Sequence, residues 1–111
     1  LHALYLDRRL RLVGRRALTR GSDAFTVVDP RQVFRPAIAS RASSVILAHN
    51  HPSGDPEPSR QDLDVTQRVA EAGRVLGVRL QDHLIVGDVS WVSLSERGAL
   101  PHYAPGPMWI P

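Results

Sequence analysis

The stretch SSVILAHNHPSGDPEPSRQD, residues 43–62, decides the fold, because it joins a strand, a loop and the start of a helix. Residues 43–51 carry apolar side chains on both faces, which is typical of a central strand covered on both sides. From Ser59 to about Leu76 the apolar residues recur at helical spacing. The stretch therefore predicts a buried strand that leads through a short loop into a helix. The predicted apolar stripe of this helix consists of Leu63, Val65, Val69, Ala72 and Leu76.

Further strands and one further helix are predicted on either side of this stretch. Asp29 followed by Pro30 indicates a helix start, with an N-cap and a proline at the first helical position. The resulting order, three strands, a helix, a strand, a helix and two strands, is typical of an α/β domain in which a mixed sheet is flanked by helices. The first helix is expected to reach about Ser40, with Val33, Phe34, Ala37 and Ile38 facing inward. The predicted strands span residues 1–7, 9–16, 24–29, 43–51, 78–88 and 90–94.

The length and composition limit the classes of protein to consider. With 111 residues, 42% of them hydrophobic, the chain is long enough for one packed domain, which we place at residues 1–100, followed by a proline-rich tail at 101–111. No run of apolar residues is long enough to span a membrane. Cysteine is absent, which excludes disulfides and thiolate ligands and favours a cytoplasmic location. Because the first residue is Leu1, we expect the start of the domain to be truncated.

Positive charge is concentrated in the first part of the chain. All 14 basic residues are arginine, and residues 8–20 hold six of them: Arg8, Arg9, Arg11, Arg15, Arg16 and Arg20. This region could bind an anionic partner such as nucleic acid or an acidic protein surface. The same pattern also fits a solvated hairpin, and Tyr5 is the only aromatic residue nearby to stack on a base. Both interpretations remain open at this stage.

Two histidines and an aspartate are candidates for a metal site. Alternate side chains of a strand point to the same face, so His49 and His51 are expected to lie together at the carboxyl end of the central strand. Ligands of α/β sheets are usually held at that end. Asp62, in the first turn of the following helix, would complete a set of three ligands. A catalytic zinc ion takes three protein ligands and leaves one position open, so these residues predict a catalytic site.

A purely structural interpretation competes with this one. Ser59 and Asp62 have the spacing of a capping box, in which the serine caps the helix and the acidic residue bonds back to the cap. A His-x-His pair on its own often arises by chance. The cap and the metal site are nevertheless compatible, because Ser59 can cap the helix while the Asp62 carboxylate faces the metal.

The spacing His49-x-His51-x₇-Ser59-x₂-Asp62 matches the JAMM motif of the JAB/MPN-type metalloproteases at every position. The surrounding sequence resembles the RadC-like branch of that family over roughly residues 1–98. Three segments carry this resemblance: DPRQVF, VILAHNHPSGDPEPSRQDLDVT and LGVRLQDHLIVGD. The resemblance implies a JAB/MPN fold with a layered, cytidine-deaminase-like architecture, and hydrolysis of a peptide or isopeptide substrate. It implies that His49, His51 and Asp62 bind Zn²⁺. It also implies that Ser59 hydrogen-bonds the zinc-bound water or the developing oxyanion.

One element of the motif is missing from the chain. In the family a glutamate that acts as general base stands just ahead of the first strand, a position that falls before Leu1. Glu57 lies near the site but does not correspond to that base. We therefore expect this chain to bind zinc and to hydrolyse poorly, and the parent protein to be the active hydrolase. A metal-free MPN scaffold is the further alternative, although such scaffolds usually lack the ligands present here. His83 is expected to be a structural histidine, with support of the metal ligands as the other possibility.

Overall fold

The computed structural model describes residues 1–18 and 28–101. The elements in that part of the chain agree with the predicted ones to within a few residues at each end. The predicted strand at 24–29 lies mostly outside the described residues, as do Arg20 and nearly all of the tail at 101–111. The elements are β1 (His2–Leu6), β2 (Leu12–Ala17), α1 (Pro30–Ala39), β3 (Ser44–Asn50), α2 (Arg60–Leu76), β4 (Arg79–Val86) and β5 (Trp91–Ser93).

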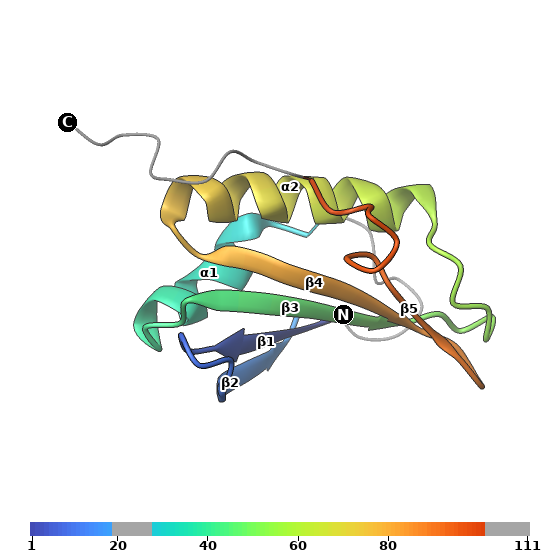
Figure 1. Ribbon diagram of the computed structural model, residues 1–111, viewed down its shortest axis with the longest axis horizontal. Coiled ribbons are helices and arrows are strands. Elements are labelled where there is room, and N and C mark those ends of the chain that lie inside the picture. The colour runs from blue at the N-terminus through green and yellow to red at the C-terminus, as the bar shows by residue number, and fades with distance from the viewer. Residues whose placement is uncertain (19–27, 102–111) are drawn as a thin grey trace.

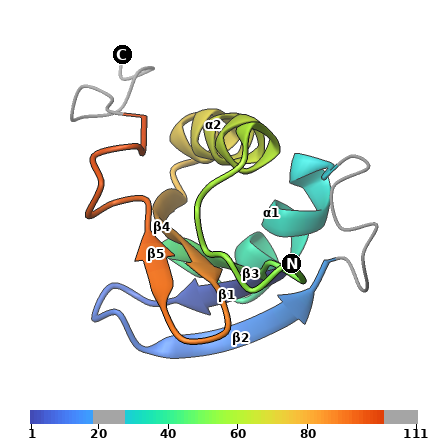
Figure 2. The ribbon, with the colours of Figure 1, turned by 90° about the vertical axis from the view of Figure 1, so that its right-hand side faces the viewer.

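The strands form one mixed sheet with the order β2-β1-β3-β4-β5, so β3 lies in the middle as predicted. The pairing of β3 with β4 is parallel, and the other three pairings are antiparallel. Helix α2 provides the crossover between the two parallel strands. Both helices lie on the same side of the sheet (Figures 1 and 2). This arrangement confirms the predicted α/β class, a mixed sheet flanked by helices.

The core lies between the sheet and the two helices. Val45 and Leu47 of β3 are fully buried there, together with Tyr5 of β1. The Tyr5 hydroxyl donates a hydrogen bond of 2.6 Å to the carbonyl oxygen of Val33, which ties α1 to the sheet. The prediction that β3 is covered on both sides was wrong for the described residues, because both helices pack on one face and the apolar side chains on the other face of β3 are only half-buried.

Local signals explain where the helices begin and end. Asp29 caps α1 and Ser59 caps α2, as predicted, and Gly77 ends α2 in the left-handed conformation with a φ of 74°. The predicted apolar stripes were partly wrong, because Ile38, Leu63 and Leu76 are exposed. In α2 the buried face instead includes polar and small residues, so hydrophobicity alone did not locate it. The residues of α2 buried against the sheet are Asp62, Val65, Thr66, Val69, Ala70 and Gly73. Neither helix in the described ranges has the length and hydropathy needed to cross a membrane.

Candidate metal centre

His49 and His51 lie at the carboxyl end of β3, on the side of the sheet that faces the helices. His49 is paired with Ile85 of the parallel strand β4, and its side chain is only 5% exposed. His51 follows the strand directly, and its backbone N–H continues the pairing by donating to the carbonyl oxygen of Val86 at 3.0 Å. The central strand therefore holds both imidazole rings at the edge of the sheet where ligands are expected.

The loop after β3 fixes the ring of His51. The His51 Nδ1 atom lies 2.8 Å from the carbonyl oxygen of Asp55, and the Gly54 N–H donates to the carbonyl oxygen of His51 at 3.0 Å. Gly54 has a φ of +85°, and a Cβ atom there would lie 2.3 Å from a carboxylate oxygen of Asp88. The turn thus requires glycine, and it positions the Asp55 carbonyl group to orient the histidine.

The start of α2 is the capping box that the spacing predicted. The Asp62 N–H donates to the Ser59 hydroxyl oxygen at 3.1 Å, and the Ser59 N–H donates to Asp62 Oδ2 at 2.7 Å. Asp62 is nevertheless 0% exposed, whereas a carboxylate that only caps a helix can remain in water. The cap explains the contact with Ser59, but it does not explain the burial of the carboxylate.

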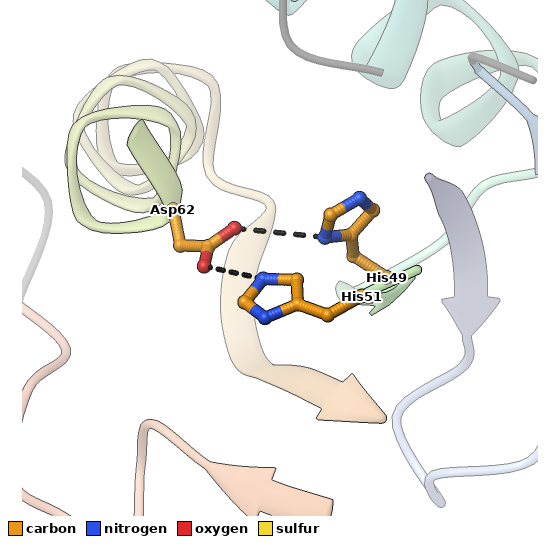
Figure 3. A group of neighbouring side chains, drawn as sticks. All are labelled: His49, His51 and Asp62. Carbon is orange, nitrogen blue, oxygen red and sulfur yellow. Dashed lines mark hydrogen bonds and ion pairs between the residues drawn. The ribbon is translucent and has the colours of Figure 1, made fainter. Parts of the chain in front are cut away.

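The three predicted ligands lie together (Figure 3). Their ligand atoms all lie within 4.8 Å of one another. His51 Nε2 is 2.9 Å from Asp62 Oδ2, and His49 Nδ1 is 3.6 Å from Asp62 Oδ1. The separation of 3.6 Å is too long for a hydrogen bond. It is close to the separation of about 3.3 Å between two ligand atoms bound to one tetrahedral zinc ion. The three residues could therefore hold a metal ion.

The protons around His51 give an independent test of this fit. The Asp55 carbonyl oxygen can only accept, so His51 Nδ1 must carry the hydrogen that the two atoms share. In a neutral ring Nε2 then has a lone pair, and this lone pair faces Asp62 Oδ2 at 2.9 Å. Two lone pairs repel at that distance unless a further proton or a metal ion lies between them. The donor set therefore suits a cation at this point.

The Asp62 carboxyl group is held in its ionised form. Burial opposes its ionisation, but contacts with His49 and Ser59 and the charge of His51 outweigh that effect and hold the pKa of Asp62 below its ordinary value. A carboxylate must be deprotonated to bind a metal, so this environment prepares Asp62 for that role. Whether the three residues bind a metal stays a prediction.

Glu57 and His83, the two other polar residues considered near the site, have separate surroundings. Glu57 is exposed and pairs with Arg97, with 2.8 Å between Oε1 and Nη1, which does not favour it as a base at the metal. His83 is buried and contacts Thr66, which the sequence reasoning missed. The available signal was spacing, because Thr66 follows Asp62 by four residues and therefore shares its face of the helix.

Comparisons with known proteins show the family of the chain. A family model described as RadC-like JAB domain matches residues 1–99. A UPF0758 protein of Geobacillus sp. (strain WCH70) is 51% identical over 96 residues, which cover 86% of this chain and 42% of the relative. Another from Syntrophotalea carbinolica is 50% identical over 98 residues, 88% of this chain and 43% of the relative. A third, from Methanococcoides burtonii, is 47% identical over 98 residues. The chain thus spans less than half the length of these relatives, whose names state no activity.

Proposed function

The chain belongs to the family of RadC-like JAB domains, and from that premise we propose that it is a zinc-dependent hydrolase domain that acts on a peptide or isopeptide bond. The ligands proposed are His49, His51 and Asp62. The observation that carries the proposal is the fully buried Asp62 carboxylate beside two imidazoles, with 3.6 Å to His49 Nδ1 and 2.9 Å to His51 Nε2. A carboxylate without such partners is rarely buried in a protein interior.

The residues of the chain would have separate tasks in this reaction. A zinc ion held there would polarise the scissile carbonyl group and lower the pKa of water to about 7. The Asp55 carbonyl group holds Nδ1 of His51, so that Nε2 points toward Asp62 and would be free to bind the metal. The Ser59 oxygen accepts from the Asp62 N–H, which leaves the hydroxyl hydrogen available to donate to a developing oxyanion.

The general base is proposed to come from a residue that precedes Leu1 in the parent protein. In the antiparallel pairing of β1 with β3, His2 lies opposite Ala48. If the pairing continued, Leu1 would lie opposite His49 and earlier residues would approach His51. A glutamate at the position that the resemblance implies would therefore reach the metal from the neighbouring strand.

Zinc content tests the metal site. We expect one zinc per chain after reconstitution and dialysis, and loss of that zinc in His51→Ala and Asp62→Ala. Matched controls are His2→Ala and Asp64→Ala, since both residues are exposed; His2 lies opposite Ala48 in the sheet, and Asp64 follows Asp62 by two residues. The controls should retain the metal. A reconstituted wild-type chain without zinc would contradict the proposal and leave residues 49–62 as a capped loop.

Hydrolysis is tested with a library of fluorogenic peptides and an isopeptide-linked peptide, on this chain and on a longer one that includes the residues before Leu1. We expect the longer chain to cleave and Asp62→Ala to abolish cleavage. Loss of the Ser59 hydroxyl should slow the reaction by about 10²–10³-fold, and absence of the base by about 10²–10⁴-fold. Equal rates for the wild type and Asp62→Ala would show that any cleavage is not due to this site.

A second proposal concerns the arginines of the β1–β2 hairpin. Arg11 is paired with Asp7 at 3.0 Å. All five described arginines of the hairpin are exposed: Arg8, Arg9, Arg11, Arg15 and Arg16. An exposed set of guanidinium groups supports binding to nucleic acid through its phosphates. Fluorescence anisotropy with a labelled duplex should then show an affinity that falls steeply as salt rises. An affinity that does not depend on salt, or no binding at low salt, would contradict it.

A further inference from the structure

A buried pair of polar side chains lies directly behind the candidate metal ligand Asp62. Thr66 of α2 and His83 of β4 are 1% and 0% exposed. The Thr66 hydroxyl donates to the Asp62 carbonyl oxygen at 2.6 Å, and Thr66 Oγ1 also lies 2.6 Å from His83 Nδ1. The three residues form a continuous hydrogen-bonded chain from the sheet to the first turn of the helix.

The number of available hydrogens fixes which atom donates in each of these hydrogen bonds. The Asp62 carbonyl oxygen can only accept, and Thr66 has one hydroxyl hydrogen, which it donates to that oxygen. The contact between Thr66 and His83 therefore needs its hydrogen from His83 Nδ1. Burial lowers the pKa of His83 to about 4, so the ring is neutral at pH 7 and Nε2 is left as a lone pair.

Packing alone does not account for a histidine at this place. His83 Nε2 is buried and forms no hydrogen bond with any described residue. An unsatisfied buried acceptor is unfavourable, and an apolar side chain of similar size would fill the space without one. Thr66 could also bond to the carbonyl group one turn back without His83, since threonine does so in many helices. The feature to be explained is the Nδ1–H group of His83, which donates from strand β4 to the hydroxyl oxygen of Thr66.

The position of His83 in the sheet shows what this donor can achieve. His83 lies opposite Leu47 of β3, two residues before His49 on the same strand. The hydrogen bonds therefore join the helical turn that carries Asp62 to the strand pair that carries His49. We propose that His83 and Thr66 are positioning residues, which hold the Asp62 carboxylate at metal-binding distance from the two histidines. The inference rests on the proposed metal site and adds the residues that set its geometry.

Zinc affinity in matched variants tests the proposal. Thr66→Val removes the hydroxyl and keeps the shape, whereas Thr66→Ser keeps the hydroxyl. His83→Leu removes the donor, whereas His83→Asn can retain an N–H near the position of Nδ1. We expect competition with a chromophoric chelator to show a zinc Kd about 10–100-fold weaker in Thr66→Val and His83→Leu. Thr66→Ser and His83→Asn should stay closer to the wild type.

The double variant Thr66→Val/His83→Leu separates a shared role from two independent ones. Because both residues act through one chain of bonds, the loss in the double variant should be clearly smaller than the product of the two single losses. Thermal unfolding of each metal-free variant shows which ones fold. Folded variants with a lower melting temperature but an unchanged zinc Kd would show that the pair is only structural, and would overturn the proposal.

A measurement on the wild-type chain needs no variant. Nitrogen-15 NMR of the imidazole rings should show His83 neutral and protonated at Nδ1; protonation at Nε2 would overturn the direction of the bonds. The outcomes also distinguish the two proposals. A wild type that binds no zinc overturns the metal site and its positioning residues together. A wild type that binds zinc, with Thr66→Val and His83→Leu equal to it, overturns the positioning role alone.

Discussion

The two helices of this chain begin with the same local chemistry and in different surroundings. At the start of α1, Asp29 accepts a hydrogen bond from the Arg31 N–H at 2.9 Å and pairs with the Arg31 guanidinium group in contact with solvent. At the start of α2, Ser59 accepts from the Asp62 N–H, and the Asp62 carboxylate is buried against His51. Each start satisfies backbone N–H groups, but only the second brings a carboxylate to two imidazoles.

The difference shows that a cap and a site are separate properties of one sequence pattern. The capping box of α2 needs an acceptor at Asp62, and a short polar side chain in water would suffice. The burial of Asp62 comes from the strand opposite, because His49 near the end of β3 and His51 directly after it face this turn of the helix. Substitutions that keep the cap and remove the charge of Asp62 test the metal site. Substitutions that remove the cap and keep this charge test the stability of the helix.

The largest expected effect is that of Asp62→Asn on zinc affinity. Asparagine keeps the size of the side chain and an acceptor oxygen for the Ser59 N–H, but it lacks the negative charge. If Asp62 is a ligand, the zinc Kd should weaken by more than the about 100-fold that loss of an outer-shell partner can cost. Chelator competition measures the change, with Asp64→Asn on the same helix as control. A variant with the affinity of the wild type would reduce Asp62 to a cap.

The second effect is the dependence of stability on pH, and it arises from His83, which contacts Thr66 of α2. Burial lowers the pKa of His83 from 6.5 to about 4; Asp62 and Asp82 oppose the shift, and His49 and His51 add to it. Between these pH values the unfolded chain binds more protons than the folded one, so the free energy of unfolding should fall as pH is lowered. The loss can reach about 3 kcal/mol by pH 4. Denaturant unfolding of metal-free protein measures it.

His83→Asn is the control for this pH effect, because asparagine does not titrate. The free energy of unfolding of this variant should change less between pH 6.5 and pH 4 than that of the wild type. In the wild type, the change follows the pKa of His83, which is 6.5 in the unfolded chain and about 4 in the folded chain. The Asp29 and Asp62 carboxyl groups have pKa values below their ordinary values, so their protonation belongs to lower pH. Parallel curves for the two proteins would mean that His83 is not the group responsible.

Much of the fold could be predicted because its signals are local. The Asp29-Pro30 start, the Ser59 cap and the Gly77 stop each depend on the backbone within one turn, and all three were confirmed. The central position of β3 was predicted from apolar residues on both of its faces, and it was confirmed although only one face is covered by helices. Predictions failed where burial depends on packing between distant elements. Leu63 was assigned to the core by its hydrophobicity, but the adjacent Asp62 and the later Thr66 occupy the buried face.

The candidate site was predicted as a set of residues but not as a geometry. The alternation of a strand places His49 and His51 on one face, and helical spacing directs Asp62 toward them. The Asp55 carbonyl group could not be predicted, since its position depends on the positive φ of Gly54 in the loop. The bond between Thr66 and His83 joins residues 17 apart, on a helix and a strand whose relative position no local pattern defines.

Replacement of Ser59 tests the cap of α2 without touching the charge. Ser59→Ala should lower the free energy of unfolding by about 1 kcal/mol and Ser59→Gly by only a few tenths, because glycine is tolerated at an N-cap. The backbone N–H that bonds to Asp62 Oδ2 remains in both variants, so the zinc Kd should change little. Urea unfolding and chelator competition give the two values. A large loss of zinc affinity in both variants would show that the hydroxyl itself supports the metal.

The smallest effect is expected at the other helix start. Asp29→Ala removes the cap of α1 together with the ion pair to Arg31, which is exposed and therefore weak. The melting temperature should fall by about 4 °C or less. The zinc Kd should stay unchanged, since no described contact of Asp29 reaches His49, His51 or Asp62.

Arg31→Ala should lower the melting temperature even less, because the Asp29 side chain would still accept from the backbone N–H of residue 31. If Asp29→Ala weakened zinc binding as much as Asp62→Asn, the two helix starts would not be separable, and the effect of Asp62 on the metal would have to be ascribed to general destabilisation of the domain.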